Sequence, residues 1–133
     1  MAGKVGGRRR SSKAGKDPAL RESLEQAMLL GGDQVRRLGS AGTSVTFSIV
    51  DAPKASVTLL LDRHPPEVAD GAEPAEVTIE LTAELAASFA RGELALPTRI
   101  FSGEVSYNGP VRKYLSFDPI LRSLLARVNA PGE

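Results

Sequence analysis

The chain has 133 residues, no cysteine and a formal net charge of +1, and 41% of its residues are hydrophobic. This length supports one domain around one small core. The lack of cysteine excludes disulfide frameworks and thiolate metal sites, and it suits a reducing compartment, so we expect a cytoplasmic protein. No apolar run in the sequence approaches the roughly 20 residues of a membrane-spanning helix.

Positive charge is concentrated at the amino end. Residues 1–16 contain six basic residues and no acidic one, whereas the rest of the chain contains 11 Lys and Arg against 16 Asp and Glu. The first segment has too few apolar side chains to offset the entropy of ordering, which predicts a disordered basic tail over 1–16 and a folded domain over 17–133. The mildly acidic domain argues against specific nucleic-acid binding. The tail is suited to weak contact with an anionic membrane.

The first predicted element is a helix that starts at Asp17-Pro18. An Asp at the N-cap followed by a proline at the first helical position is a typical start, because the missing N–H has no intrahelical partner there. Apolar residues then recur at helical spacing up to Gly31-Gly32, and a short helical continuation follows. These apolar positions are Leu20, Leu24, Ala27, Met28, Val35 and Leu38.

Three strands are predicted next, over residues 45–49, 57–61 and 77–81. In each segment apolar residues recur at every second position, the period of a half-buried strand. The first two segments are joined by the short turn Asp51-Ala52-Pro53-Lys54 and predict a hairpin. Proline-rich residues 64–73 are predicted to form a loop before the third strand.

The carboxyl-terminal half returns to helices. Thr82 is predicted to cap a helix that carries Leu85 and Phe89 on one side and ends at Gly92. A short strand is expected over residues 104–108, and Pro110 opens another helix. Asp118-Pro119 repeats the cap-plus-proline pattern before an amphipathic segment, with Ile120, Leu121, Leu124, Leu125 and Val128 on one face. This order of elements predicts an α+β fold, with a single mixed or antiparallel sheet of four to five strands and helices covering one face.

The sequence contains almost no motif typical of a catalytic or metal-binding site. His64 is the only histidine and stands without a second ligand at metal-binding spacing. The nucleophile elbow, the P-loop and the dinucleotide fingerprint do not occur. We therefore expect no catalytic residue, no metal and no cofactor.

With these elements in place, the chain resembles the sterol carrier protein type two family of lipid-binding domains from about Leu20 to Leu125. The resemblance rests on Val77-Thr78-Ile79-Glu80-Leu81-Thr82, on the segment from Leu85 to Gly92-Glu93-Leu94, and on Phe101-x-Gly103-x-Val105-x-Tyr107-x-Gly109, in the family's order and near its spacing. It implies a sheet with helices on one face and, between them, a hydrophobic tunnel for fatty acyl, sterol or isoprenoid-like ligands. Two departures are expected: the loop over 64–73 replaces one strand, leaving four, and residues 118–128 form a full helix where many relatives have a looser tail.

The resemblance implies non-catalytic binding and transfer or presentation of a lipid, with Tyr107 and Tyr114 as polar contacts to its head group. Core packing is a competing role for the apolar residues. Two different functions also fit the sequence: an accessory domain or homodimer that binds its partner through the last helix, and an enzyme that uses Glu104 or Asp118 on a hydrophobic substrate. The ligand-binding residues expected from the resemblance are Phe47, Ile79, Leu85, Phe89, Leu94, Phe101, Val105, Tyr107, Tyr114, Leu121, Leu124 and Leu125.

Overall fold

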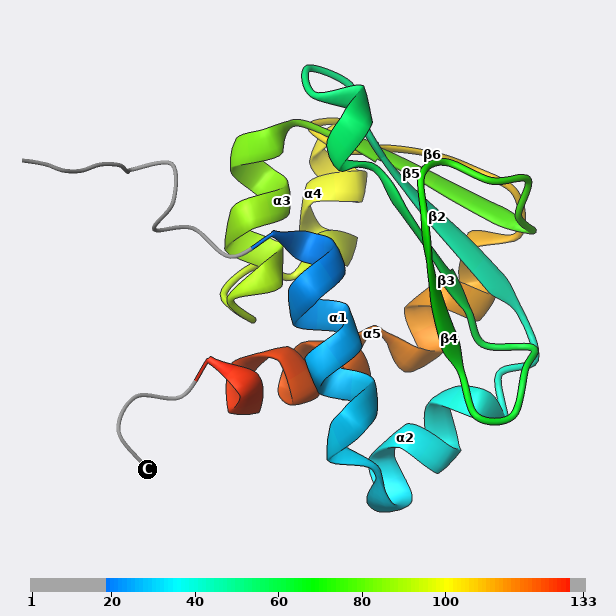
Figure 1. Cartoon of the computed structure of the whole chain (residues 1–133). Helices are drawn as coiled ribbons and strands as arrows, with labels where there is room; N and C mark the ends of the chain where they lie inside the picture. The colour runs from blue at the N-terminus through cyan, green and yellow to red at the C-terminus, as the bar shows by residue number, and fades with distance from the viewer. Residues whose placement is uncertain (1–18, 130–133) are drawn as a thin grey trace, which may run out of the picture.

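The computed structural model describes residues 19–129 (Figure 1). The tail predicted over 1–16 and the helix cap predicted at Asp17-Pro18 lie outside these residues. The helices are α1 (Leu20–Leu30), α2 (Gly32–Gly39), α3 (Ala83–Ala90), α4 (Leu96–Ser102) and α5 (Val111–Val128), with a short 3-10 turn at Pro53–Ala55. The strands are β2 (Ser44–Ile49), β3 (Val57–Leu60), β4 (Glu67–Asp70), β5 (Val77–Leu81) and β6 (Ser106–Asn108).

The strands form one mixed sheet in the order β4-β3-β2-β5-β6. The predicted hairpin is confirmed, since β2 and β3 pair antiparallel, while β2 and β5 pair parallel. The α+β class is therefore confirmed. The sheet of four to five strands is confirmed with five, but the prediction that a loop over 64–73 replaces one strand is wrong, because Glu67–Asp70 forms the edge strand β4 against β3. A four-residue edge strand with acidic ends carries too little alternation to stand out in the sequence.

The core lies on the face of the sheet that the helices cover (Figure 1). The parallel register sets Val45 beside Val77, Phe47 beside Ile79 and Ile49 beside Leu81. All six side chains are at most 1% exposed. Because alternate residues of a strand point to the same face, these pairs form a continuous apolar floor for the helices.

The opposite face of the sheet is crossed by the connection from β4 to β5. The Thr58 hydroxyl donates to the carbonyl of Gly71 (2.9 Å) and accepts from the backbone N–H of Glu73 (3.0 Å). The Thr46 hydroxyl donates to the Glu73 carbonyl (2.6 Å). Both threonines are buried. Residues 71–76 are thus fixed to the polar face of the two central strands by side-chain hydrogen bonds.

Helix α5 is continuous across Pro119, so the prediction of a second helix capped by Asp118 is wrong. Proline removes one intrahelical hydrogen bond. The apolar face of the helix nevertheless continues past it, with Phe117 and Leu121 both buried in the core. Helix α5 also contacts each of the other four described helices, so tertiary packing outweighs the lost bond.

A second departure concerns residues 94–108. The segment predicted as a connection between Leu94 and Phe101 contains α4, and the strand predicted over 104–108 is limited to Ser106–Asn108. Pro97 lies in the first turn of α4, and Gly103 ends it with a left-handed conformation (φ 87°). These are the residues that favour a helix start and a helix end, respectively.

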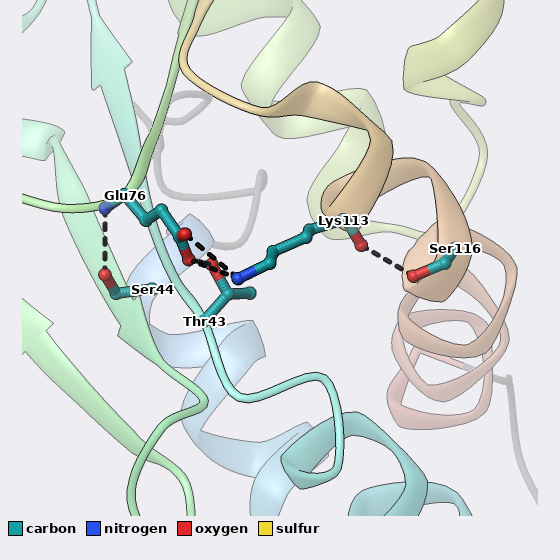
Figure 2. A network of polar contacts seen from close by, with 5 residues as sticks. All are labelled: Thr43, Ser44, Glu76, Lys113 and Ser116. Carbon is teal, nitrogen blue, oxygen red and sulfur yellow. Dashed lines mark hydrogen bonds and ion pairs between the residues drawn. The ribbon is translucent and has the colours of Figure 1, made fainter.

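The first turn of α5 is tied to the sheet by the Glu76 network, which comprises Thr43, Ser44, Glu76 and Lys113 (Figure 2). The Glu76 carboxylate accepts hydrogen bonds from the Thr43 hydroxyl and from Lys113 Nζ, the latter at 2.9 Å to Oε2. Its backbone N–H donates to Ser44 Oγ (3.0 Å). The bond from Thr43, followed by that from Lys113, lowers the pKa of Glu76. This network joins the starts of β2, β5 and α5.

Candidate functional site

A groove of about 490 Å³ lies between α3 and α4 and is open to the surface; we call it the α3–α4 groove. The Thr82 hydroxyl caps α3 by accepting from the backbone N–H of Leu85 (3.2 Å). Capping sets the first turn of the helix, so that Leu85 and Ser88 both face the groove. The lining residues are Thr82, Glu84, Leu85, Ser88, Leu94, Arg99 and Glu104.

The lining combines an apolar surface with a charged rim. Leu94 is buried and Leu85 is half-buried. Arg99 of α4 forms an ion pair with Glu104, just beyond the end of the helix. Ligand sites commonly have volumes of roughly 300–1,000 Å³ and combine mostly apolar walls with a few polar groups. The groove has the size and chemistry to hold part of an elongated, mostly apolar molecule.

A row of aromatic rings connects α3 with α5 through the core; we call it the aromatic row. Phe89 of α3 lies 5.5 Å from Phe47 of β2, measured between ring centroids. Phe47 makes an edge contact with Tyr114 of α5 at 6.3 Å, and Tyr114 makes another with Phe117 at 5.0 Å. Such tilted and edge-to-face pairs stabilise beyond their buried area. The row begins one helical turn after Leu85, a residue of the groove.

At the α5 end of this row lies a buried pair of polar side chains, Tyr114 and Asp118. They are one turn apart on α5, and the Tyr114 hydroxyl donates a hydrogen bond to Asp118 Oδ1. Tyr114 is fully buried and Asp118 is 1% exposed. Burial raises the pKa of Asp118, and this effect exceeds the opposing influences of the Tyr114 hydrogen bond and the Arg122 charge. Burial likewise raises the pKa of Tyr114 well above its usual range.

The structure places the twelve predicted ligand-binding residues in three settings. Leu85 and Leu94 line the α3–α4 groove. Phe101 and Tyr107 are 80% and 46% exposed. The other eight lie in the core, at most 2% exposed: Phe47, Ile79, Phe89, Val105, Tyr114, Leu121, Leu124 and Leu125. Contact of these residues with a lipid stays a prediction.

The carboxyl-terminal helix uses its apolar face within the chain itself. Leu121, Leu124 and Leu125 are fully buried against the protein's own core. The two acids considered for catalysis are in unlike environments. Glu104 is exposed at the rim of the groove beside Arg99, whereas Asp118 is enclosed in the core beside Tyr114.

Sequence reasoning missed the polar part of the groove. Thr82 was expected only to cap a helix, and Ser88 and Arg99 were not singled out. Arg99 reaches the groove because residues 96–102 are helical. The signal for that helix was Pro97 in the first turn followed by Gly103 after the last, a pairing that favours a short helix.

Comparisons with known proteins identify the fold. No protein-family model matches the chain, and no curated protein does. Solved structures do match. Sterol carrier protein 2 from Yarrowia lipolytica, in its apo form, has a TM-score of 0.64 at 14% identity, with 86% of this chain and 96% of that chain covered. Sterol carrier protein domain 2 of Helicoverpa armigera has a TM-score of 0.59 at 16% identity, covering 93% and 98%.

The UbiJ-SCP2 ubiquinone synthesis protein has a TM-score of 0.58 at 17% identity, covering 86% of this chain and 95% of that chain. Across residues 19–129, none of the helices is long and apolar enough to cross a membrane. The matches extend over most of both chains. The chain has the fold of the sterol carrier protein 2 domains.

Proposed function

We propose that this protein binds a lipid without catalysis and transfers or presents it, and that the α3–α4 groove is where the ligand enters. The observation that carries the proposal is the apolar surface of Leu85 and Leu94 in a groove of about 490 Å³. Two of the similar solved structures are named sterol carrier proteins, which supports a lipid as the ligand class.

The expected ligand is an elongated apolar molecule of the fatty acyl, sterol or isoprenoid-like type. Burying a methylene group gains about 0.8 kcal/mol, so about ten methylenes gain roughly 8 kcal/mol before ordering costs, which corresponds to micromolar binding. Part of this burial is available in the groove. The rest requires core side chains beside α3, above all Phe89, to turn aside and admit part of the ligand between the helices and the sheet.

Binding without catalysis fits the placement of the reactive groups. Glu104 is held in an ion pair with Arg99, and one oxygen of the Asp118 carboxylate accepts a hydrogen bond from the Tyr114 hydroxyl. We further propose that the basic segment 1–16 makes weak, salt-sensitive contact with an anionic membrane during delivery, and that the protein acts in the cytoplasm.

Native mass spectrometry of protein purified without added lipid tests the proposal directly. We expect a co-purifying lipid and saturable uptake of a fluorescent fatty acid or a fluorescent long-chain alcohol. Leu85→Asp places a charge on the groove wall and is expected to weaken uptake at least about tenfold. Leu29→Asp is the matched control, since Leu29 is a helical leucine that is 84% exposed and lies outside the groove. Equal uptake by both variants, each shown to be folded, would contradict the proposed site.

A further inference from the structure

The carboxylate of Asp118 is incompletely paired inside the core. Its Oδ1 accepts a hydrogen bond from the Tyr114 hydroxyl. Within the described part of the chain the carboxylate has no other hydrogen bond and no ion pair. The side chain is 1% exposed, so surface water does not compensate. An ionised carboxylate has about four acceptor positions and no donor. Oδ2 is therefore a buried acceptor without a partner, a condition that is rare because it is costly.

The charged residue near this pair does not supply the missing partner of Asp118 Oδ2. Arg122 lies one helical turn after Asp118 and is half-buried, and its charge lowers the pKa of the carboxyl. Among residues 19–129 it forms no ion pair with Asp118. Burial outweighs its influence. The Tyr114 hydroxyl uses its one hydrogen in the bond to Asp118, so beside an ionised Asp118 the pair offers only acceptors to a third group.

We infer that the Tyr114–Asp118 pair receives the head group of the bound lipid, and that this head is a hydrogen-bond donor such as an alcohol or an amine. The inference rests on the proposed lipid-binding function. A hydroxyl or ammonium group can donate to Oδ2 and complete the pairing of the carboxylate. An ionised fatty acid would instead place a second negative charge beside Asp118 in a region of low dielectric, which is unfavourable.

The aromatic row gives this head group a route. Phe89 lies one turn beyond Leu85 on α3 and contacts Phe47, which contacts Tyr114. A ligand whose tail lies in the α3–α4 groove and whose head points inward would replace contacts along these rings. The rings are apolar as far as the Tyr114 hydroxyl, so the polar partners at the end of the row are the two members of the pair.

The test compares two ligands with the same chain, 1-decanol and decanoate, by isothermal titration calorimetry at pH 8, where decanoate is ionised. We expect wild-type protein to bind the alcohol at least about tenfold more tightly, the scale of a hydrogen bond to a charged group. Asp118→Asn removes the negative charge with little change of shape and is expected to reduce the ratio to about threefold or less. Glu80→Gln, on the far face of the sheet and exposed, is the matched control and should keep the wild-type ratio.

Each outcome either supports or rejects the head-group assignment. Equal or tighter binding of decanoate by wild-type protein would overturn the inference, and so would an unchanged ratio in Asp118→Asn. If Asp118→Asn does not fold, two wild-type measurements decide: the ratio of 1-decanol to decanoate binding, and the binding of decylamine, which should be tighter than that of decanoate. Tighter binding of decanoate than of decylamine would overturn the inference. Binding of decanoate but not 1-decanol would leave lipid binding intact and reject the head-group assignment. Failure of all three ligands to bind would reject the proposed function itself.

Discussion

Replacing Asp118 by asparagine should stabilise the protein at neutral pH. Asparagine has nearly the same shape, and its amide oxygen can still accept the hydrogen bond from Tyr114. The substitution removes the negative charge of Asp118. This residue is 1% exposed, and its carboxylate accepts one hydrogen bond, from Tyr114. Because Asp118 is enclosed, solvent does not screen the cost of that charge. We expect the free energy of unfolding at pH 7 to rise by about 1–2 kcal/mol, the scale of a poorly paired buried polar group.

The sign follows from the pKa. Burial raises the pKa of Asp118 in the folded protein above its ordinary value near 3.8. A raised carboxyl pKa means that the neutral form is the one the fold favours. The stabilisation from protonated Asp118 is fully present below the ordinary pKa and is lost as the pH rises through the folded pKa. Asparagine stays neutral throughout, so the advantage of the variant should be absent near pH 3.5 and grow towards pH 7.

Urea unfolding of both proteins at about pH 3.5 and pH 7 measures this difference. Subtracting wild type from variant cancels the other carboxylates, including Glu76, whose contribution to stability has the opposite dependence on pH. The reasoning would be refuted if Asp118→Asn were less stable than wild type at pH 7, or if the difference were the same at both pH values.

Three further predictions address the core, a turn and the Glu76 network. Phe89→Ala should lower the free energy of unfolding by about 3–5 kcal/mol, whereas Phe101→Ala should change it by less than about 0.5 kcal/mol, because the first side chain is buried and the second is 80% exposed; similar losses in urea unfolding would contradict this placement. Gly109→Ala should prevent folding, as seen by circular dichroism, because φ is +104° and an added Cβ would overlap the carbonyl oxygen of Glu76; a native spectrum would argue against this turn. Glu76→Gln should make the melting temperature fall less steeply as the pH drops from about 5 to 2. The pKa of Glu76 is lowered in the folded protein, so its protonation at low pH removes stability that the glutamine variant never had. The same fall of melting temperature with pH in both proteins would show that the Glu76 network does not contribute to stability.

Periodicity predicted the central part of the fold because only one face of the sheet is apolar. The strands at Val45 and Val77 alternate apolar and polar residues, and the structure buries the apolar set under the helices. The pattern failed where tertiary context decides. Strand β4 has one paired edge and acidic ends, and α5 continues through Pro119 because the core holds the helix on both sides of the proline.

The candidate site was only partly accessible from the sequence. Leu85 and Leu94 could be chosen as apolar residues of a lipid-binding region, and they do line a groove. The partnership of Tyr114 with Asp118 was hidden, because the cap-plus-proline pattern suggested a helix start at Asp118. Spacing of i, i+4 places two residues on the same face of one helix, but only if the helix is known to be continuous.

The parallel pairing of β2 with β5 bears on when this protein can fold during its synthesis. The central strand of the sheet acquires one of its neighbours from residues that follow it by about 30 positions, and α5, which contacts all the other described helices, is the last of the described elements. Contacts between distant residues form late, because a long loop must close first. A nascent chain that has emerged only as far as Asp70 holds β2, β3 and β4 without α3 or α5 to shelter their apolar face. The ribosome must therefore release the chain through α5 before a stable domain can form, and until then only α1 among the helices that contact β3 and β4 has emerged to cover the sheet.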